Sequence, residues 1–358
     1  MRLFIITATF FLFVVYLGYS NIMSQGRVFL NAGFDQSMLT QKIELIQQDL
    51  KRLDTGVAPN WLSQLAPVIW WHSNEKFKSV NAEEVFKTAD LWMRSLDSNR
   101  ITTAQQVNLG PIQLMDWRHV KFQDLSPTQP ITRLFETASP RNGLVGFELR
   151  FNPFEPTKEK PQLMWRLGKH PIFNDVQSND SSSMIVPIEF WYYMNFNPTG
   201  VWIGNHEGDW ESFLFVVRLT VKDKQTSITP LLISTSAHKG SSWHCIAELS
   251  KNSANEFELF SALGTHATYV SEGLHTKGIL PDRTERGSGW ETKEALTPLV
   301  KQNFYGFSGS WGRTEFSYFQ SGPLPPGPEF KYIPSETNRV KALDEFQHAL
   351  KECENGKI

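Results

Sequence analysis

Apolar residues recur at helical spacing in three parts of the chain. One stripe runs through residues 35–54 and another through 336–352, and each has the period of an amphipathic helix. A further stripe at 81–96 begins with Asn81, a favourable N-cap, followed by acidic residues that suit the first turn of a helix. We therefore expect helices at these three places.

Between residues 140 and 320 the pattern changes to short apolar runs separated by Gly, Pro, Asn and Ser. Strands at this spacing are typical of an antiparallel sandwich or barrel. The expected strands are 145–151, 184–196, 210–221, 229–236, 243–249, 256–263 and 266–270. The expected fold class is mainly β: a two-layer antiparallel β-sandwich over 61–335, with helical additions at the N-terminal (21–60) and C-terminal (336–358) ends.

The composition agrees with a β-rich protein and argues against one class of partner. Of 358 residues, 12 are Trp, 26 Phe, 23 Gly and 20 Pro, which favours strands and turns over a helical bundle. The 35 basic and 37 acidic residues leave a formal charge of −2, without a long basic stretch. We therefore expect no nucleic acid among the partners.

The first twenty residues predict export. One Arg precedes a nearly uninterrupted apolar run from Leu3 to Leu17, which is short for a membrane span and suits a secretory signal. Gly18 and Ser20 form a small-x-small cleavage site. Residues 1–20 are therefore expected to be a signal peptide or an uncleaved N-terminal membrane anchor. The remainder is expected outside the cytoplasm: secreted, periplasmic or membrane-anchored.

The chain has only two cysteines, Cys245 and Cys353. This number excludes a disulfide scaffold and a Cys-rich zinc site. A single bridge between the two stays open, because an exported protein meets an oxidising environment.

The stretch GNHEGDWE has the highest density of ligand-type side chains in the chain. If a strand begins at Asp209, then Asp209 and Glu211 share one face, about 6.6 Å apart along the strand. A half-buried pair of carboxylates is costly without a counter-ion. Gly208 permits a turn that brings His206 to the same place, whereas Glu207 points the other way, toward solvent or a structural role.

Two further histidines, His238 and His266, lie at the ends of expected strands, where a site at the rim of the sandwich could gather them. Carboxylates with imidazoles predict a divalent cation, Mg or Ca in preference, with Mn or Zn as alternatives. The expected metal ligands are His206, Asp209, Glu211, His238 and His266. Two other interpretations stay open: an acidic surface turn, and a pair of catalytic carboxylates of the glycosidase kind.

Four blocks of the chain stand out: LAPVIWWHSNEKF at 65–77, FWYYMNFNPTG with NHEGDWE at 190–211, STSAHKGSSW with SALGTHATYVSEG at 234–273, and GSWGRTEF with SGPLPPGP at 309–328. In this order they resemble the family named for vacuolar protein sorting-associated protein 62. They span about three quarters of the chain. Residues 100–180 contain no block of this resemblance.

A more distant similarity is to the necrosis-inducing cytolysins, secreted β-sandwich proteins in which a divalent cation near the rim helps to bind a sphingolipid sugar headgroup. Their H-x-x-D-x-E spacing is met by His206, Asp209 and Glu211. The cytolysins also use an upstream aspartate, and Asn197 or Asn195 stands in the corresponding stretch MNFNPTG. The resemblance thus implies Asn197 as a possible additional ligand, with one negative charge fewer.

These observations predict a cation-binding module for a polar lipid headgroup or glycan at a membrane surface. Aromatic residues expected to stack on the ligand are Tyr192, Trp202, Trp210 and Trp243. Two alternatives stay open. One is a metal-assisted hydrolase acting on a phosphoester, ester or glycoside, and the other is a structural protein whose metal only joins strand ends. The oligomeric state is not indicated by the sequence.

Overall fold

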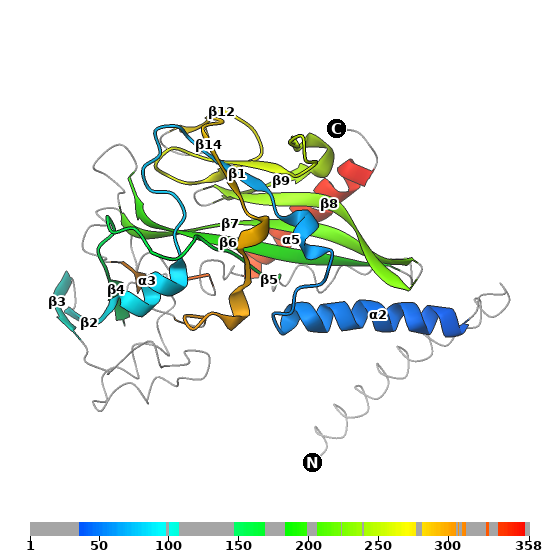
Figure 1. Cartoon of the computed structure of the whole chain (residues 1–358), viewed down its shortest axis with the longest axis horizontal. Helices are drawn as coiled ribbons and strands as arrows, with labels where there is room; N and C mark the ends of the chain where they lie inside the picture. Colours follow the sequence, from blue (N-terminus) through cyan, green and yellow to red (C-terminus); the bar gives the residue numbers. More distant parts are fainter. Residues whose placement is uncertain are drawn as a thin grey trace, which may run out of the picture.

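The computed structural model describes twelve segments of the chain. They are residues 36–97, 100–106, 147–168, 183–198, 206–222, 224–237, 240–276, 281–305, 307, 310–312, 327–328 and 336–354. Strands dominate, and helices lie near both ends (Figure 1). The expectation of a mainly β protein with helical additions at the N- and C-terminal ends is therefore confirmed.

A six-stranded sheet forms the centre of the described fold. Its order is β15-β5-β6-β7-β8-β9. The bounds are β15 Leu296–Pro298, β5 Leu163–Leu167, β6 Ser183–Asn197, β7 His206–Lys222, β8 Gln225–Ala237 and β9 Gly240–Cys245. Strand β7 contains the HEGDWE residues and pairs antiparallel with β6 on one side and β8 on the other. It is therefore a central strand of this sheet.

Three smaller sheets contain the other paired strands that the structure describes. One has the order β11-β10-β1-β14, another β16-β4-β2-β3, and β12 pairs with β13. The bounds are β1 Val68–Trp71, β2 Asp90–Asp97, β3 Arg100–Gln106, β4 Phe147–Arg150, β10 Glu258–Ser261, β11 Thr268–Tyr269, β12 Gly273–His275, β13 Asp282–Thr284, β14 Ser288–Glu291 and β16 Ser310–Trp311. The pairings of β1 with β10, β15 with β5, and β16 with β4 are parallel, so the sheets are mixed where antiparallel pairing alone was expected.

The two faces of β7 enter two different cores. Phe213 and Phe215 pack in one cluster with Trp71 of β1, which places the β11-β10-β1-β14 sheet against this face. Helix α2 (Gln36–Asp54) adds Ile46 to the same cluster. Trp210, on the opposite face, packs with residues of helix α3 (Ala82–Thr88) and strand β16. The period-two alternation along β7 thus divides its side chains between the two cores.

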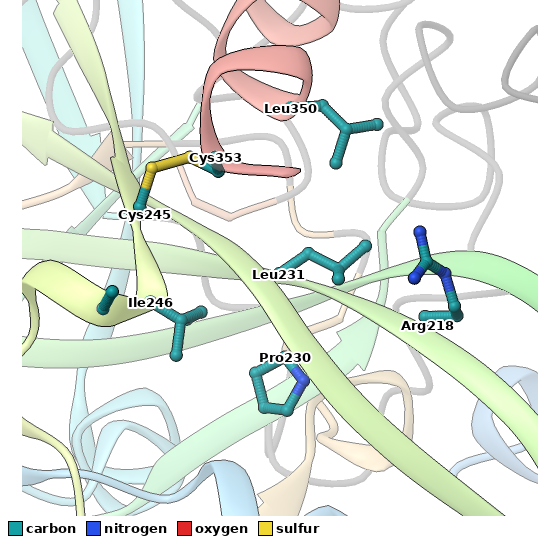
Figure 2. Close-up of a pocket in the computed structure, with 8 residues that line it drawn as sticks. Arg218, Pro230, Leu231, Cys245, Ile246, Leu350 and Cys353 are labelled. Carbon is teal, nitrogen blue, oxygen red and sulfur yellow. A yellow bond between two sulfur atoms is a disulfide. The ribbon is translucent and has the colours of Figure 1, made fainter. Parts of the chain in front are cut away.

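Helix α5 (Glu336–Glu354) covers the outer part of the central sheet. Its Phe346 is buried against Val216 and Leu232. A disulfide joins Cys245 at the end of β9 to Cys353 in the helix, so the bridge that the sequence left open is formed. A cavity of about 440 Å³ lies between the helix and the strands (Figure 2). Its lining residues are Arg218, Pro230, Leu231, Cys245, Ile246, Ala247, Leu350 and Cys353.

The prediction of a helix over 81–96 is wrong for the second half of this segment. Asn81 caps α3 by accepting a hydrogen bond from the Glu84 backbone N–H, but the helix ends at Thr88 and β2 begins at Asp90. The segment 90–97 instead pairs with β3 and β4, so strand pairing overrides a helical spacing of apolar residues. The strand expected at 243–249 likewise ends at Cys245. Short 3-10 helices are η1 Leu62–Leu65, η5 Ile246–Glu248, η6 Lys293–Ala295 and η7 Leu299–Lys301.

Several expectations fall outside the described residues. The signal peptide or anchor at 1–20, Trp202 and His238 are among them. Within the part of the chain that the structure describes, no helix is long and apolar enough to cross a membrane.

Candidate functional site

The HEGDWE residues do not form a turn but begin strand β7, with one local irregularity at Gly208. Gly208 has φ +66, and a Cβ at this position would lie 2.0 Å from the carbonyl oxygen of Trp311. Only glycine therefore fits here, because the conformation is left-handed and the backbone of Trp311 is too close. The pairing with β6 skips Gly208, so Met194 faces Asp209 and Asn197 faces His206.

His266 occupies the centre of the site between two carboxylates. Its side chain is fully buried. Its Nδ1 lies 3.0 Å from Oδ2 of Asp209, and its Nε2 lies 3.5 Å from Oε1 of Glu75. Burial alone would lower the pKa of His266, but the interactions with Asp209 and Glu75 outweigh it and raise the pKa to about 9. The ring is therefore an imidazolium at neutral pH.

The backbone of His266 is also unusual, with φ +56. A left-handed conformation is uncommon for residues other than Gly, although Asn, Asp and His adopt it more often than the rest, and such strain concentrates at functional sites. The edge of Trp71 meets the ring at a centroid distance of 6.3 Å. Packing and two ion pairs together hold this strained residue in place.

Glu75 reaches the site from the loop after β1. Its carboxylate accepts hydrogen bonds from the backbone N–H groups of Gly264 and Phe77, both at 2.7 Å. Burial raises the pKa of Glu75, but His266 and these two N–H groups bring it below its usual value. Glu75 was not among the predicted site residues. Its one signal was its place in the block LAPVIWWHSNEKF, because no ligand spacing connects it to the motif at 206–211.

His206 and Asn197 form the outer part of the same hydrogen-bond network. The half-buried His206 donates from Nδ1 to the carbonyl oxygen of Gly208 at 2.8 Å. Its Nε2 then accepts from Nδ2 of Asn197 at 3.1 Å, and the same amide group donates to Oδ2 of Asp209 at 3.3 Å. These partners fix the orientation of the amide. The buried Oδ1 of Asn197 has no hydrogen-bond donor among the described residues.

Glu211 lies on the same face of β7 as Asp209, two residues further along the strand. It is 6% exposed and accepts a hydrogen bond from Oγ of Ser236 in β8 at 3.0 Å. Nearby, Tyr192 bonds to Oγ1 of Thr268 at 2.8 Å. Burial, followed by the negative charge of Glu211, raises the pKa of Tyr192 well above its usual value. The prediction that Asp209 and Glu211 share a face is confirmed.

The described residues do not fit a preformed cage for a divalent cation. Among them, no group of three or more His, Cys, Asp or Glu side chains is placed to hold a metal ion. The ring of His266 instead lies between Asp209 and Glu75, and Oδ2 of Asp209 also faces Asn197. Since His238 lies outside the described residues, the five-residue ligand set and the identity of its cation stay predictions.

Of the aromatic residues expected to stack on a ligand, the structure describes Tyr192, Trp210 and Trp243, and each packs against other parts of the fold. Tyr192 and Trp210 are fully buried, so a sugar ring cannot reach their faces. Trp243 packs on Phe346 of α5 with ring centroids 5.2 Å apart. Glu207 does lie opposite to Asp209, but it is 2% exposed rather than in solvent. Its charge adds to the effect of burial in raising the pKa of Tyr193.

Comparisons with known proteins show distant relatives. Vacuolar protein sorting-associated protein 62 of the yeast Saccharomyces cerevisiae is 26% identical over 245 residues, covering 51% of this chain and 50% of the relative. A second yeast protein, provisionally named vacuolar protein sorting-associated protein TDA6, is 22% identical over 323 residues, covering 75% of this chain and 63% of the relative. No family model and no solved structure matches the chain. The chain is thus distantly related to these two yeast proteins and spans only part of the length of each.

Proposed function

We propose that this protein is a binding module whose polar site recognises the headgroup of a lipid, or a glycan, at a membrane surface. The site consists of Glu75, Asn197, His206, Asp209 and His266. In this proposal, His266 offsets one of the two negative charges of Asp209 and Glu75 from within, and His206 and Asn197 contact the ligand. The H-x-x-D-x-E spacing of His206, Asp209 and Glu211, which resembles that of the cytolysins, is the sequence feature that suggests a ligand of this class.

The observation that carries the proposal is the accepting oxygen of Asn197. An amide oxygen that is buried without a donor is unfavourable by about 1–3 kcal/mol. Here the Asn197 amide is held from behind by Asp209 and His206, so its Oδ1 cannot turn toward another described partner. In this proposal, a hydroxyl or ammonium group of a polar headgroup enters beside the half-buried His206 and supplies the hydrogen bond that this oxygen lacks.

Two further observations support a function at a membrane, outside the cytoplasm. The bridge between Cys245 and Cys353 belongs to a class of bond that persists in oxidising compartments. It therefore agrees with export directed by residues 1–20. Both yeast relatives are named for vacuolar protein sorting, a process of membrane compartments.

The test is binding of soluble ligands: water-soluble lipid headgroups and a panel of glycans, titrated into purified protein by calorimetry. Asn197→Ala and His206→Ala should each weaken binding about tenfold, the effect of one lost hydrogen bond to a buried group. His244→Ala is the matched control, because His244 lies on β9 and contacts Glu248 instead. Equal affinity in all four proteins would refute the proposal.

The same titration tests the cation. We expect binding to persist with a chelator, since the described residues carry their own counter-ion in His266. Loss of binding with chelator, restored by Mg or Ca, would show that a cation belongs to the site. Turnover of any ligand in the panel would favour the metal-assisted hydrolase instead. A fall in melting temperature with chelator, with no ligand bound at all, would favour the purely structural role.

A further inference from the structure

Three phenylalanines form an aromatic cluster at the molecular surface. The ring centroids of Phe77 and Phe154 are 5.8 Å apart, those of Phe77 and Phe196 5.1 Å, and those of Phe154 and Phe196 5.7 Å. We call them the phenylalanine patch. Phe154 is 70% exposed, the largest exposure among the large hydrophobic residues that are exposed in the described part of the chain. Such a cluster is unfavourable in water unless a partner covers it.

The phenylalanine patch adjoins the polar site. The backbone N–H of Phe77 donates to Oε1 of Glu75, and Phe196 immediately precedes Asn197 in β6. Nδ2 of Asn195 donates to the carbonyl oxygen of Glu155, next to Phe154, at 3.2 Å. A hydrogen bond to Glu75 of the site and one from Asn195, beside the site in β6, therefore fix two of the three segments that carry the rings. The three rings therefore pack together as one ordered surface cluster and are not separate surface residues.

Positive charge flanks the phenylalanine patch. Lys76 and Lys78 stand on either side of Phe77, and both are exposed. Lys78 bonds to Oγ of Ser288 at 2.7 Å, which holds its ammonium group near this edge. The segment after Phe154 also carries exposed Lys158 and Lys160, balanced by Glu155 and Glu159. The excess of charge therefore lies at Phe77.

We propose that the phenylalanine patch, with Lys76 and Lys78, inserts into the headgroup region of an anionic lipid bilayer. Phenyl rings without a polar tip suit the boundary between headgroups and acyl chains, and lysines beside them suit anionic headgroups. Phenyl rings can stack on a sugar but offer it no hydrogen bonds, so these three rings suit acyl chains better than a glycan. This inference depends on the proposed function in one respect only. When the patch is inserted, the polar site beside it faces the lipid headgroups.

The experiment is sedimentation of the purified protein with vesicles of phosphatidylcholine alone or with added phosphatidylserine. Phe154→Ser should lower the partition coefficient about tenfold on both kinds of vesicle, because it removes one inserted ring. The pair Lys76→Gln and Lys78→Gln should lower it about fivefold for each lysine, on the anionic vesicles only and less at high salt. Val57→Ser, at a residue that is 46% exposed beside α2, and Lys293→Gln are the matched controls.

The outcomes separate this inference from the proposed function. Wild-type levels of vesicle binding in Phe154→Ser, with an unchanged melting temperature, would overturn the inference. So would sedimentation of the protein without vesicles that Phe154→Ser abolishes, because the patch would then join two copies of the chain. If the inference is correct, Phe154→Ser still binds soluble headgroups as the wild type does. Vesicle binding without any soluble-ligand binding would support the patch and contradict the proposed function alone.

Discussion

The ion pairs of His266 make the stability of the protein dependent on pH. The pKa of His266 is raised from 6.5 to about 9. One pKa unit corresponds to about 1.4 kcal/mol, so protonation of this ring contributes about 3 kcal/mol to folding. Because the folded-state pKa is the higher one, this contribution is fully present below about pH 6.5. It is lost as the pH rises through about 9.

The assay is urea-induced unfolding of wild type and His266→Asn at several pH values between neutral and pH ~10. Asparagine is the chosen replacement because it tolerates the left-handed backbone at this position. We expect the free energy of unfolding of the wild type to fall by about 3 kcal/mol more than that of the variant over this range. Comparison with the variant removes the effect of other groups that titrate at high pH.

Two results would contradict this reasoning. One is a variant that loses as much stability as the wild type between neutral and alkaline pH. The other is a wild type whose stability is constant there, which would mean that His266 is neutral in the folded protein. At the acidic end the sign is reversed for Glu75, whose pKa is lowered. Its contribution is present above about pH 4.5 and is lost as the pH falls.

Three other substitutions test separate parts of the structure. Gly208→Ala should destabilise the protein by about 3 kcal/mol or more in urea unfolding, because its Cβ would meet the carbonyl oxygen of Trp311 and its φ is +66. A milder effect would mean that β7 can shift here. Cys245→Ser with Cys353→Ser should lower the free energy of unfolding by about 4–5 kcal/mol, since the bridge closes a loop of 108 residues. Reduced wild type should behave in the same way. Asn197→Asp places a second carboxylate beside Asp209, so we expect a lower melting temperature that Mg or Ca restores in the variant but not in the wild type.

The strands of the central sheet were largely predictable because their two faces differ along the sequence. The alternation from Asp209 to Leu219 assigns Phe213 and Phe215 to one core and Trp210 to the other, as the structure has them. The segment 90–97 was mispredicted because its pairing with β3 and β4 is a tertiary contact that local spacing does not encode.

The candidate site was predictable only in part. His266 and Asp209 do meet, as the placement of histidines at strand ends indicates. Glu75 was missed, because a residue 134 positions before Asp209 enters the site through a loop that the sequence pattern does not place. The presence of Glu75 changes the balance of charge around His266. With carboxylates on both sides, His266 is placed to act as their counter-ion.

The protonation state of His266 in protein free of divalent cations tests this account most directly. Nitrogen-detected NMR of the histidine rings at neutral pH measures it. We predict that both ring nitrogens of His266 carry protons, and that Nδ1 of His206 carries the proton it donates to Gly208. These signals should not change when Mg, Ca, Mn or Zn is added. A neutral His266 whose free nitrogen shifts on addition of metal would contradict the account and restore the metal centre.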